Sequence, residues 1–234
     1  MQTFPIPKRR AEVRVNDFVR SVYNWMCIGL ALTAVVALYV SSSDALFNLI
    51  FQNRLIFFGL ILGELALVFS ISGMVNRISG ATASALFVLY SALNGATLSM
   101  IFRIYTSESI ASTFFICSAT FLACSIYGWV TKRDLTSLGG FLTMGLIGII
   151  IASFANMFFL SSAVSRIVSY IGVIVFVGLT AYDTQKLKNM ASTQPADLDG
   201  EVVRKGAILG ALSLYLDFIN LFLMLLRIFG SSRD

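Results

Sequence analysis

The sequence has 234 residues, of which 57% are hydrophobic and only 12% are charged, with a net charge of +5. Soluble domains carry about 25% charged residues, so the composition excludes an ordinary water-soluble domain. Histidine is absent, which removes the usual transition-metal ligand and the usual near-neutral base. Any response to pH must therefore depend on carboxyl groups.

Seven apolar stretches are long enough, at about 20 residues each, to cross a bilayer as helices. They cover residues 22–42, 55–73, 81–102, 110–130, 138–160, 165–187 and 207–229. We therefore predict an all-α membrane protein, with an N-terminal tail (1–21) and a single seven-helix transmembrane domain (22–234). A six-span alternative would make 165–187 a re-entrant or interfacial segment. We expect 188–206 to be the only clearly polar loop, and the first helix to be retained rather than cleaved as a signal peptide.

The positions of Lys and Arg predict the orientation, because cytoplasmic loops are rich in these residues. With the N-terminus in the cytoplasm, twelve of the 17 basic residues lie inside. The five outside are Arg54, Arg103, Arg166, Arg227 and Arg233. The basic residues thus follow membrane topology, and we predict a lipid bilayer rather than a nucleic acid as partner.

Small residues recur at helical spacing in two spans. We expect them to let helix backbones approach one another in lipid. They are Gly139, Gly140, Gly145, Gly148, Gly206 and Gly210.

The three cysteines (Cys27, Cys117 and Cys124) lie in apolar runs without CxxC spacing, so we expect small buried hydrophobic side chains and neither a disulfide framework nor a zinc site.

Three acidic residues lie inside apolar spans, where a charge is costly by about 2.5–3.5 kcal/mol even on the lowest scale. Glu64 is near the middle of the second span, Asp183 near the cytoplasmic end of the sixth, and Asp217 about ten residues into the seventh. The sixth and seventh spans are consecutive and antiparallel, so both aspartates fall in the cytoplasmic half. Two carboxyl groups that meet there cannot both ionise cheaply, and they would titrate as a pair that shares one proton.

Each of these residues also has a simpler interpretation. Asp183 could face the interface and pair with Lys186 or Lys188. Asp217 could make a purely structural hydrogen bond. Glu64 could be neutral and held by Asn94 or Thr97 of the third span.

No motif of a known enzyme class is present: the sequence has no HExxH, no GxSxG and no P-loop, and it lacks a histidine for a triad. An intramembrane di-aspartyl protease would also use two membrane aspartates. Its Tyr-Asp signature is matched weakly by Tyr182-Asp183, but Tyr215-Leu216-Asp217 does not match its Gly-x-Gly-Asp signature. We therefore predict that the protein is not an enzyme and has no resident cofactor.

The segments 176–188 (FVGLTAYDTQKLK) and 214–227 (LYLDFINLFLMLLR) resemble the signatures of the Bax inhibitor-1 family, also called transmembrane Bax-inhibitor-motif proteins. The basic tail, SVYNWM at 21–26 and LYSALNG at 89–95 resemble the bacterial branch with the YccA-like inner-membrane proteins. The resemblance implies seven helices with the seventh central, a multi-pass protein of the bacterial inner membrane, and a calcium-permeable leak that responds to pH.

On this sequence the resemblance places the pH sensor and gate at Asp183 and Asp217, which would also be the Ca²⁺ ligands. It implies a membrane glutamate, for which Glu64 fits, and a basic latch, for which Arg77 is the candidate; Asn94 is a further candidate for the ion pathway. We therefore predict a Ca²⁺ leak channel gated by the aspartate pair. The alternative is a non-conducting regulator that acts by contact with a membrane-bound AAA protease or another membrane partner.

Overall fold

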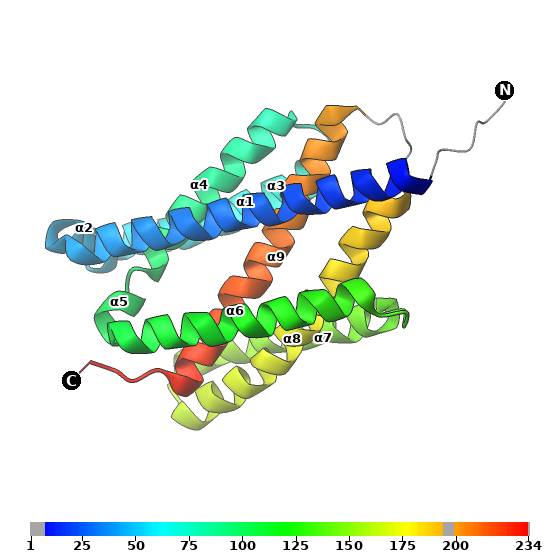
Figure 1. The fold of residues 1–234 in the computed structure, drawn as a ribbon. Coiled ribbons are helices and arrows are strands. Elements are labelled where there is room, and N and C mark those ends of the chain that lie inside the picture. The colour runs from blue at the N-terminus through cyan, green and yellow to red at the C-terminus, as the bar shows by residue number, and fades with distance from the viewer. Residues whose placement is uncertain (1–7, 194–198, 234) are drawn as a thin grey trace. The chain divides into compact units, whose positions relative to one another are not determined.

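The computed structural model describes residues 8–193 and 199–233, with side chains from Val15 onward. The described part is almost entirely helical, and its one β-type pairing is an isolated antiparallel bridge between Tyr105 and Ser232. The helices in chain order are α1 (Lys8–Ser42), α2 (Asp44–Phe51), α3 (Arg54–Met74), α4 (Gly80–Leu98), α5 (Ile101–Ile104), α6 (Ser107–Val130), α7 (Thr136–Phe159), α8 (Ser162–Thr193) and α9 (Gly200–Phe229) (Figure 1).

Seven of the described helical stretches are long and apolar enough to cross a membrane, which confirms the predicted all-α multi-pass fold. They are Val15–Ser42, Arg54–Met74, Gly80–Ile104, Ser107–Val130, Thr136–Phe159, Ser162–Thr193 and Gly200–Phe229. The sixth is an unbroken helix of 32 residues, so it has the length of a full span rather than of a re-entrant segment.

Helical structure extends beyond two of the predicted spans. α1 begins at Lys8, within the predicted tail 1–21, and the assignment of 1–21 as a cytoplasmic tail stays a prediction; residues 1–7 lie outside the described part. The polar loop 188–206 is shorter than expected, because α8 continues to Thr193 and α9 begins at Gly200. Residues 194–198 lie outside the described part. Polar residues extend both helices because a helix that leaves the apolar layer can continue in water.

Short polar residues mark where several helices begin. The side chains of Ser43, Asn53, Ser79 and Thr106 accept hydrogen bonds from backbone N–H groups in the first turns of α2, α3, α4 and α6. Such caps satisfy donors that have no partner within the helix. The starts of these four helices are therefore specified locally, by one residue each.

The chain divides into two compact units. The first contains Met1–Ile104 and Lys188–Ser213, and the second contains Tyr105–Leu187 and Leu214–Asp234. That residues 22–234 form a single transmembrane domain stays a prediction. Asp183 and Asp217 belong to the second unit, whereas Glu64, Arg77 and Asn94 belong to the first.

In the first unit, α1 packs along α4 (Figure 1). A Cβ atom at Gly95 of α4 would lie 2.6 Å from the backbone oxygen of Thr33 in α1, so the two backbones approach closely there. The Thr33 hydroxyl donates to the carbonyl of Ser91 at 2.8 Å. At the start of α4, the N–H of Gly80 donates to Glu201 of α9 at 2.9 Å.

In the second unit, α8 is in contact with α6, α7 and the last part of α9. A Cβ atom at Gly128 of α6 would lie 2.2 Å from the carbonyl oxygen of Ala181 in α8. A Cβ atom at Gly139 of α7 would meet the ring of Tyr182 at 2.4 Å. The close approach of these helices is therefore made possible by glycine, as expected for packing in lipid.

The structure separates the predicted packing glycines into two groups. Gly139 and Gly145 face α8, where a Cβ at Gly145 would lie 3.0 Å from Val175. Gly140 and Gly148 have no atom within 4 Å of a Cβ and face away.

The expectation for the cysteines was right for Cys117, which is buried, and wrong for Cys27, which is exposed on α1.

Helix α9 is the most buried of the candidate spans in the described part: 72% of its apolar window is buried, against 39% or less elsewhere. This agrees with its composition, because a helix that is apolar on most sides can be buried on most sides. Its central position in the bundle stays a prediction.

Candidate functional site

The two membrane aspartates lie on α8 and α9 within the same unit. Asp217 is only 5% exposed, and its Oδ2 atom has no hydrogen-bond partner among the described residues. Asp183 is half-buried and close enough for its charge to act on Asp217. The described residues include no hydrogen bond between the two carboxyl groups, and their pairing stays a prediction.

The residues on either side of Asp217 in the sequence are apolar. The next residue, Phe218, packs edge-on against Phe121 of α6, with ring centroids 5.4 Å apart, and against Phe114 at 5.7 Å. The Cys117 thiol donates to the carbonyl of Phe218 at 3.7 Å. The simple interpretation of Asp217, a structural hydrogen bond, finds no support in the described residues for its Oδ2 atom.

Asp183 has a positive neighbour one turn later on the same helix. Lys186 is close enough to act on Asp183 electrostatically, but the two residues form no ion pair in the described part. The Lys186 ammonium lies instead 6.0 Å from the centre of the Tyr182 ring. The alternative interpretation of Asp183, an ion pair with Lys186, is therefore not supported by a direct contact in the described part.

Sequence reasoning missed Gln185, which lies two residues after Asp183. Its Oε1 atom accepts from the N–H of Leu135, and its Nε2 atom donates to the carbonyl of Arg133, both at 2.8 Å. Gln185 is buried, so it fixes the connection between α6 and α7 to α8 beside Asp183. The sequence did offer one signal: in DTQKLK, Gln185 is a neutral amide among charged residues. A buried amide must satisfy both its donor and its acceptor, so it can tie two segments together.

Three buried hydroxyl groups of the second unit were also missed. The Oγ atoms of Thr113, Ser125 and Thr184 have no hydrogen-bond partner among the described residues. Burying such a group without a partner costs about 1–3 kcal/mol. Together with Asp217, this unit therefore contains four buried polar side chains that present oxygen atoms without a described partner.

The residues that the structure describes contain no group of three or more His, Cys, Asp or Glu side chains able to hold a metal ion. The candidate Ca²⁺ ligands are thus two carboxylates, Asp183 and Asp217. Resident Ca²⁺ sites supply six to eight oxygen ligands. The pair is accordingly better suited to a passing cation than to a stored one.

Glu64 lies on α3 of the first unit and is held by two residues of α4. The Thr97 hydroxyl donates to Glu64 Oε1 at 2.5 Å, and the Asn94 amide donates to Glu64 Oε2 at 3.4 Å. These are the two partners that the sequence suggested for a structural glutamate. Asn94, the ion-pathway candidate, is thus placed as a partner of Glu64.

Arg77 lies in the turn between α3 and α4, with its side chain exposed. Its backbone N–H donates to the carbonyl of Met74 at 2.8 Å, and its guanidinium makes no ion pair or hydrogen bond with the described residues. This is the geometry of a basic residue at a span end. Its role as a latch for the aspartate pair stays a prediction.

Comparison with known proteins supports the family resemblance that the sequence motifs indicated. A family model described as "Inhibitor of apoptosis-promoting Bax1" matches residues 15–234. The chain is 56% identical over 219 residues to the inner membrane protein YbhL of Escherichia coli, covering 94% of this chain and 93% of that protein. It is 49% identical over 219 residues to a protein of Borreliella burgdorferi, covering 94% of each chain. It is 46% identical over 222 residues to protein RP147 of Rickettsia prowazekii, covering 94% of this chain and 92% of that one. The family model and these relatives span nearly the whole chain, both aspartate motifs included, and the chain therefore belongs to the Bax inhibitor-1 family.

Proposed function

We propose that this protein is a pH-sensitive, calcium-permeable leak of the bacterial inner membrane, and that Asp183 and Asp217 form its gate. The observation that carries the proposal is the state of Asp217, which is 5% exposed and has a carboxyl oxygen without a hydrogen-bond partner among the described residues. The location follows from the seven candidate spans and from the similarity to the E. coli inner membrane protein.

A buried carboxylate with an oxygen that accepts no hydrogen bond is destabilised as an anion, and a second carboxyl group nearby adds repulsion. The pair therefore favours a state in which one group keeps its proton. Loss of that proton places two negative charges between α8 and α9, which favours either separation of the helices or entry of a cation. A change of proton concentration is thereby coupled to a change in the bundle.

Calcium fits the proposed gate because hard cations prefer oxygen ligands and carboxylates above all. Two carboxylates attract a divalent cation without enclosing it. Conduction needs binding that is strong enough for entry and weak enough for release. A pair rather than a full coordination shell meets both conditions.

The test is Ca²⁺ flux into proteoliposomes that contain a trapped calcium indicator, measured from pH 5 to pH 8. We expect the native protein to conduct above the level of empty liposomes, with a rate that depends on pH. Asp217→Asn and Asp183→Asn each leave one carboxyl group that titrates without its partner, so the pH dependence should disappear or move in both. Asp134→Asn, in the exposed connection between α6 and α7, is the matched control and should behave like the native protein.

An unchanged pH dependence in both pair variants would contradict the proposed gate. Absence of flux in the native protein, with correct folding shown by thermal unfolding, would contradict the leak itself. In that case the non-conducting regulator becomes the better hypothesis, with capture of a membrane protease as its own test.

A further inference from the structure

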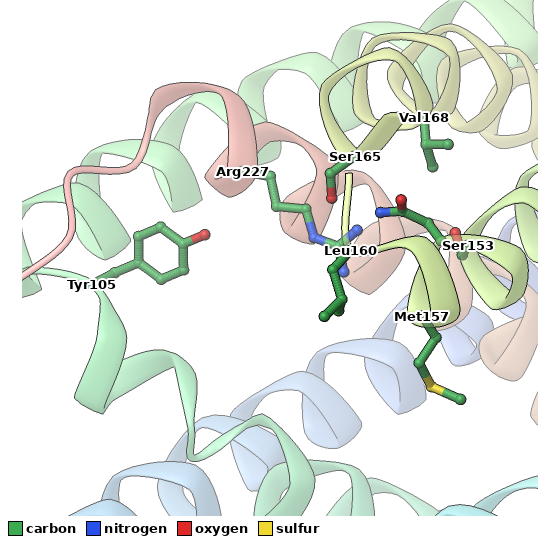
Figure 2. Close-up of a pocket in the computed structure, with 8 residues that line it drawn as sticks. Tyr105, Ser153, Met157, Leu160, Ser165, Val168 and Arg227 are labelled. Carbon is green, nitrogen blue, oxygen red and sulfur yellow. The ribbon is translucent and has the colours of Figure 1, made fainter. Parts of the chain in front are cut away.

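A pocket of about 460 Å³ lies at the end of the second unit where α7 ends, α8 begins and α9 ends. It is separate from the aspartate pair: Arg227, which lines it, follows Asp217 by ten residues, or about 15 Å along α9. Its lining residues are Tyr105, Ser153, Asn156, Met157, Leu160, Ser165, Val168 and Arg227 (Figure 2).

The turn between α7 and α8 shapes one wall of the pocket. Leu160 ends α7 in the left-handed conformation, with φ of 50°, and its N–H donates to the carbonyl of Asn156 at 2.8 Å. The Asn156 side chain accepts from the N–H of Ser161 at 3.0 Å. These bonds hold the turn in place without using the guanidinium of Arg227.

The C-terminal segment shapes the opposite wall. The N–H of Thr106 donates to the carbonyl of Ser231 at 3.1 Å, and Tyr105 pairs with Ser232 in the isolated bridge. A Cβ atom at Gly230 would lie 2.6 Å from the ring of Tyr105, so glycine is needed for this contact. The ring of Tyr105 is thereby fixed at the edge of the pocket.

The pocket is positively charged. Among the residues that the structure describes, Arg227 is the one charged side chain that lines it, and none of the acidic ones does. The guanidinium makes no ion pair or hydrogen bond with the residues that the structure describes. Figure 2 shows it directed toward Ser165 and Leu160, into the pocket rather than away from it. An arginine held there offers several N–H donors in a planar fork, the geometry that binds phosphate with two hydrogen bonds.

The other lining groups fit an amphipathic ligand. The hydroxyls of Ser153, Ser165 and Tyr105 can donate to oxygen atoms, and Met157 and Val168 offer an apolar side. The neighbouring surface of α7 is strongly apolar, because Phe158, Phe159 and Leu160 are 70%, 79% and 84% exposed. Exposed aromatic residues at the end of a span lie at the level of the lipid headgroups.

We propose that this pocket binds the phosphate of an anionic membrane phospholipid, with the guanidinium of Arg227 as its main ligand and the acyl chains along the end of α7. The shared chemistry is a phosphate anion, which a lipid headgroup or free inorganic phosphate can supply. The exposed apolar surface beside the pocket favours the lipid. The site does not depend on conduction or on the aspartate pair.

The experiment is thermal unfolding of the full-length protein in detergent, titrated with short-chain (dioctanoyl) phosphatidylglycerol and, separately, with inorganic phosphate. A ligand that binds the folded state stabilises it by RT ln(1 + [L]/Kd), so the rise of the unfolding temperature with ligand concentration gives an apparent Kd. Arg227→Gln removes the proposed ligand, and Arg227→Lys keeps the charge but not the planar fork. Arg166→Gln is the matched control, since Arg166 is exposed, adjoins Ser165 and does not line the pocket.

We expect phosphatidylglycerol to stabilise the native protein and Arg166→Gln equally. We expect at least about tenfold weaker binding in Arg227→Gln, because this substitution removes a hydrogen-bonded charge pair. Arg227→Lys should weaken binding less. Ser153→Leu, at an exposed position of α7, should also weaken binding because it fills the pocket, and it keeps the test valid if Arg227→Gln does not fold.

Equal affinity in the native protein, Arg227→Gln and Ser153→Leu would overturn the site. An equal loss in Arg166→Gln would also overturn it, because binding would then follow the general surface charge. Inorganic phosphate that binds as tightly as the lipid, with the same dependence on Arg227, would retain the phosphate site and reject the lipid as its source. No binding of either ligand by the native protein would overturn both.

Discussion

Gln185 and Leu135 are joined by a buried hydrogen bond in which the Leu135 N–H donates to the Gln185 side-chain oxygen at 2.8 Å. The amide nitrogen of the same side chain donates to the carbonyl of Arg133. One side chain of α8 thus replaces the missing cap of α7, because Leu135, the residue before α7, makes no side-chain capping bond of its own. The two bonds tie the connection between α6 and α7 to the helix that carries Asp183.

We predict that Gln185→Leu destabilises the protein by about 2–4 kcal/mol, because the buried N–H of Leu135 and the part-buried carbonyl of Arg133 lose their partners at once. Gln185→Glu should cost at least as much, since an ionised carboxylate still accepts from Leu135 but repels the carbonyl oxygen of Arg133 and buries a charge. Thermal or denaturant unfolding in detergent measures both. Lys186→Gln, one residue further and exposed, is the control. If Gln185→Leu unfolds at the same temperature as the native protein, the two bonds are unimportant for stability.

Gln185 also marks the boundary of what the sequence could predict. The seven spans were predictable because their length and apolar composition are set by the bilayer. The partners of Glu64 were predictable too, because a glutamate at mid-span needs donors and the third span offered Asn94 and Thr97 at a suitable depth. By contrast, Gln185 occurs in a polar segment. Its sequence context does not distinguish an amide bonded to a backbone 50 residues away from an ordinary residue at the membrane interface.

The direction in which each small residue faces was not predictable. Gly139 contacts Tyr182 whereas the next residue, Gly140, faces open space. In a soluble helix, polar residues would mark the outer face. In a membrane span both faces are apolar, so the pattern of α7 gives no signal. Because both faces are apolar, the sequence also did not indicate which of the three cysteines is exposed.

Gly128 of α6 lies against the backbone of Ala181, two residues before Asp183. We predict that Gly128→Ala destabilises the protein by about 1–3 kcal/mol, because the added methyl group would lie 2.2 Å from a carbonyl oxygen and the helices must separate. Gly148→Ala, at an open position of α7, should be neutral or stabilising by up to about 1 kcal/mol, since alanine favours the helix. Unfolding temperatures of the two variants measure the contrast. Equal temperatures would show that α6 and α8 are not in close contact at Gly128.

Glu64 and Thr97 join α3 to α4 inside the apolar layer. We predict that Glu64→Leu costs about 1–3 kcal/mol of stability, because the Thr97 hydroxyl and the Asn94 amide lose their acceptor and Thr97 keeps only a long contact to the carbonyl of Leu93, at 3.4 Å. Glu64→Gln should cost less than about 1 kcal/mol, because its amide can accept from Asn94 while it donates to the Thr97 hydroxyl. A double-mutant cycle of Glu64→Leu with Thr97→Val isolates the pair. Strictly additive effects of the two substitutions would contradict a direct interaction.

Asp134 precedes α7 outside the candidate spans, and its carboxylate accepts from the N–H of Thr136 at 2.9 Å. Hydrogen bonds from the Thr136 side chain and backbone lower the pKa of Asp134 from its ordinary value of about 3.9. Because the pKa is lower in the folded state, the stabilisation is present above the ordinary pKa and is lost as the pH falls through the lowered one. Asp134 therefore stays ionised between pH 5 and pH 8, which makes it a suitable control for the flux experiment. A carboxyl-carbon NMR titration should give a midpoint below the ordinary pKa, and Thr136→Val should raise it part of the way because the backbone donor remains. A midpoint that does not move in Thr136→Val would show that the hydroxyl of Thr136 has no part in lowering the pKa.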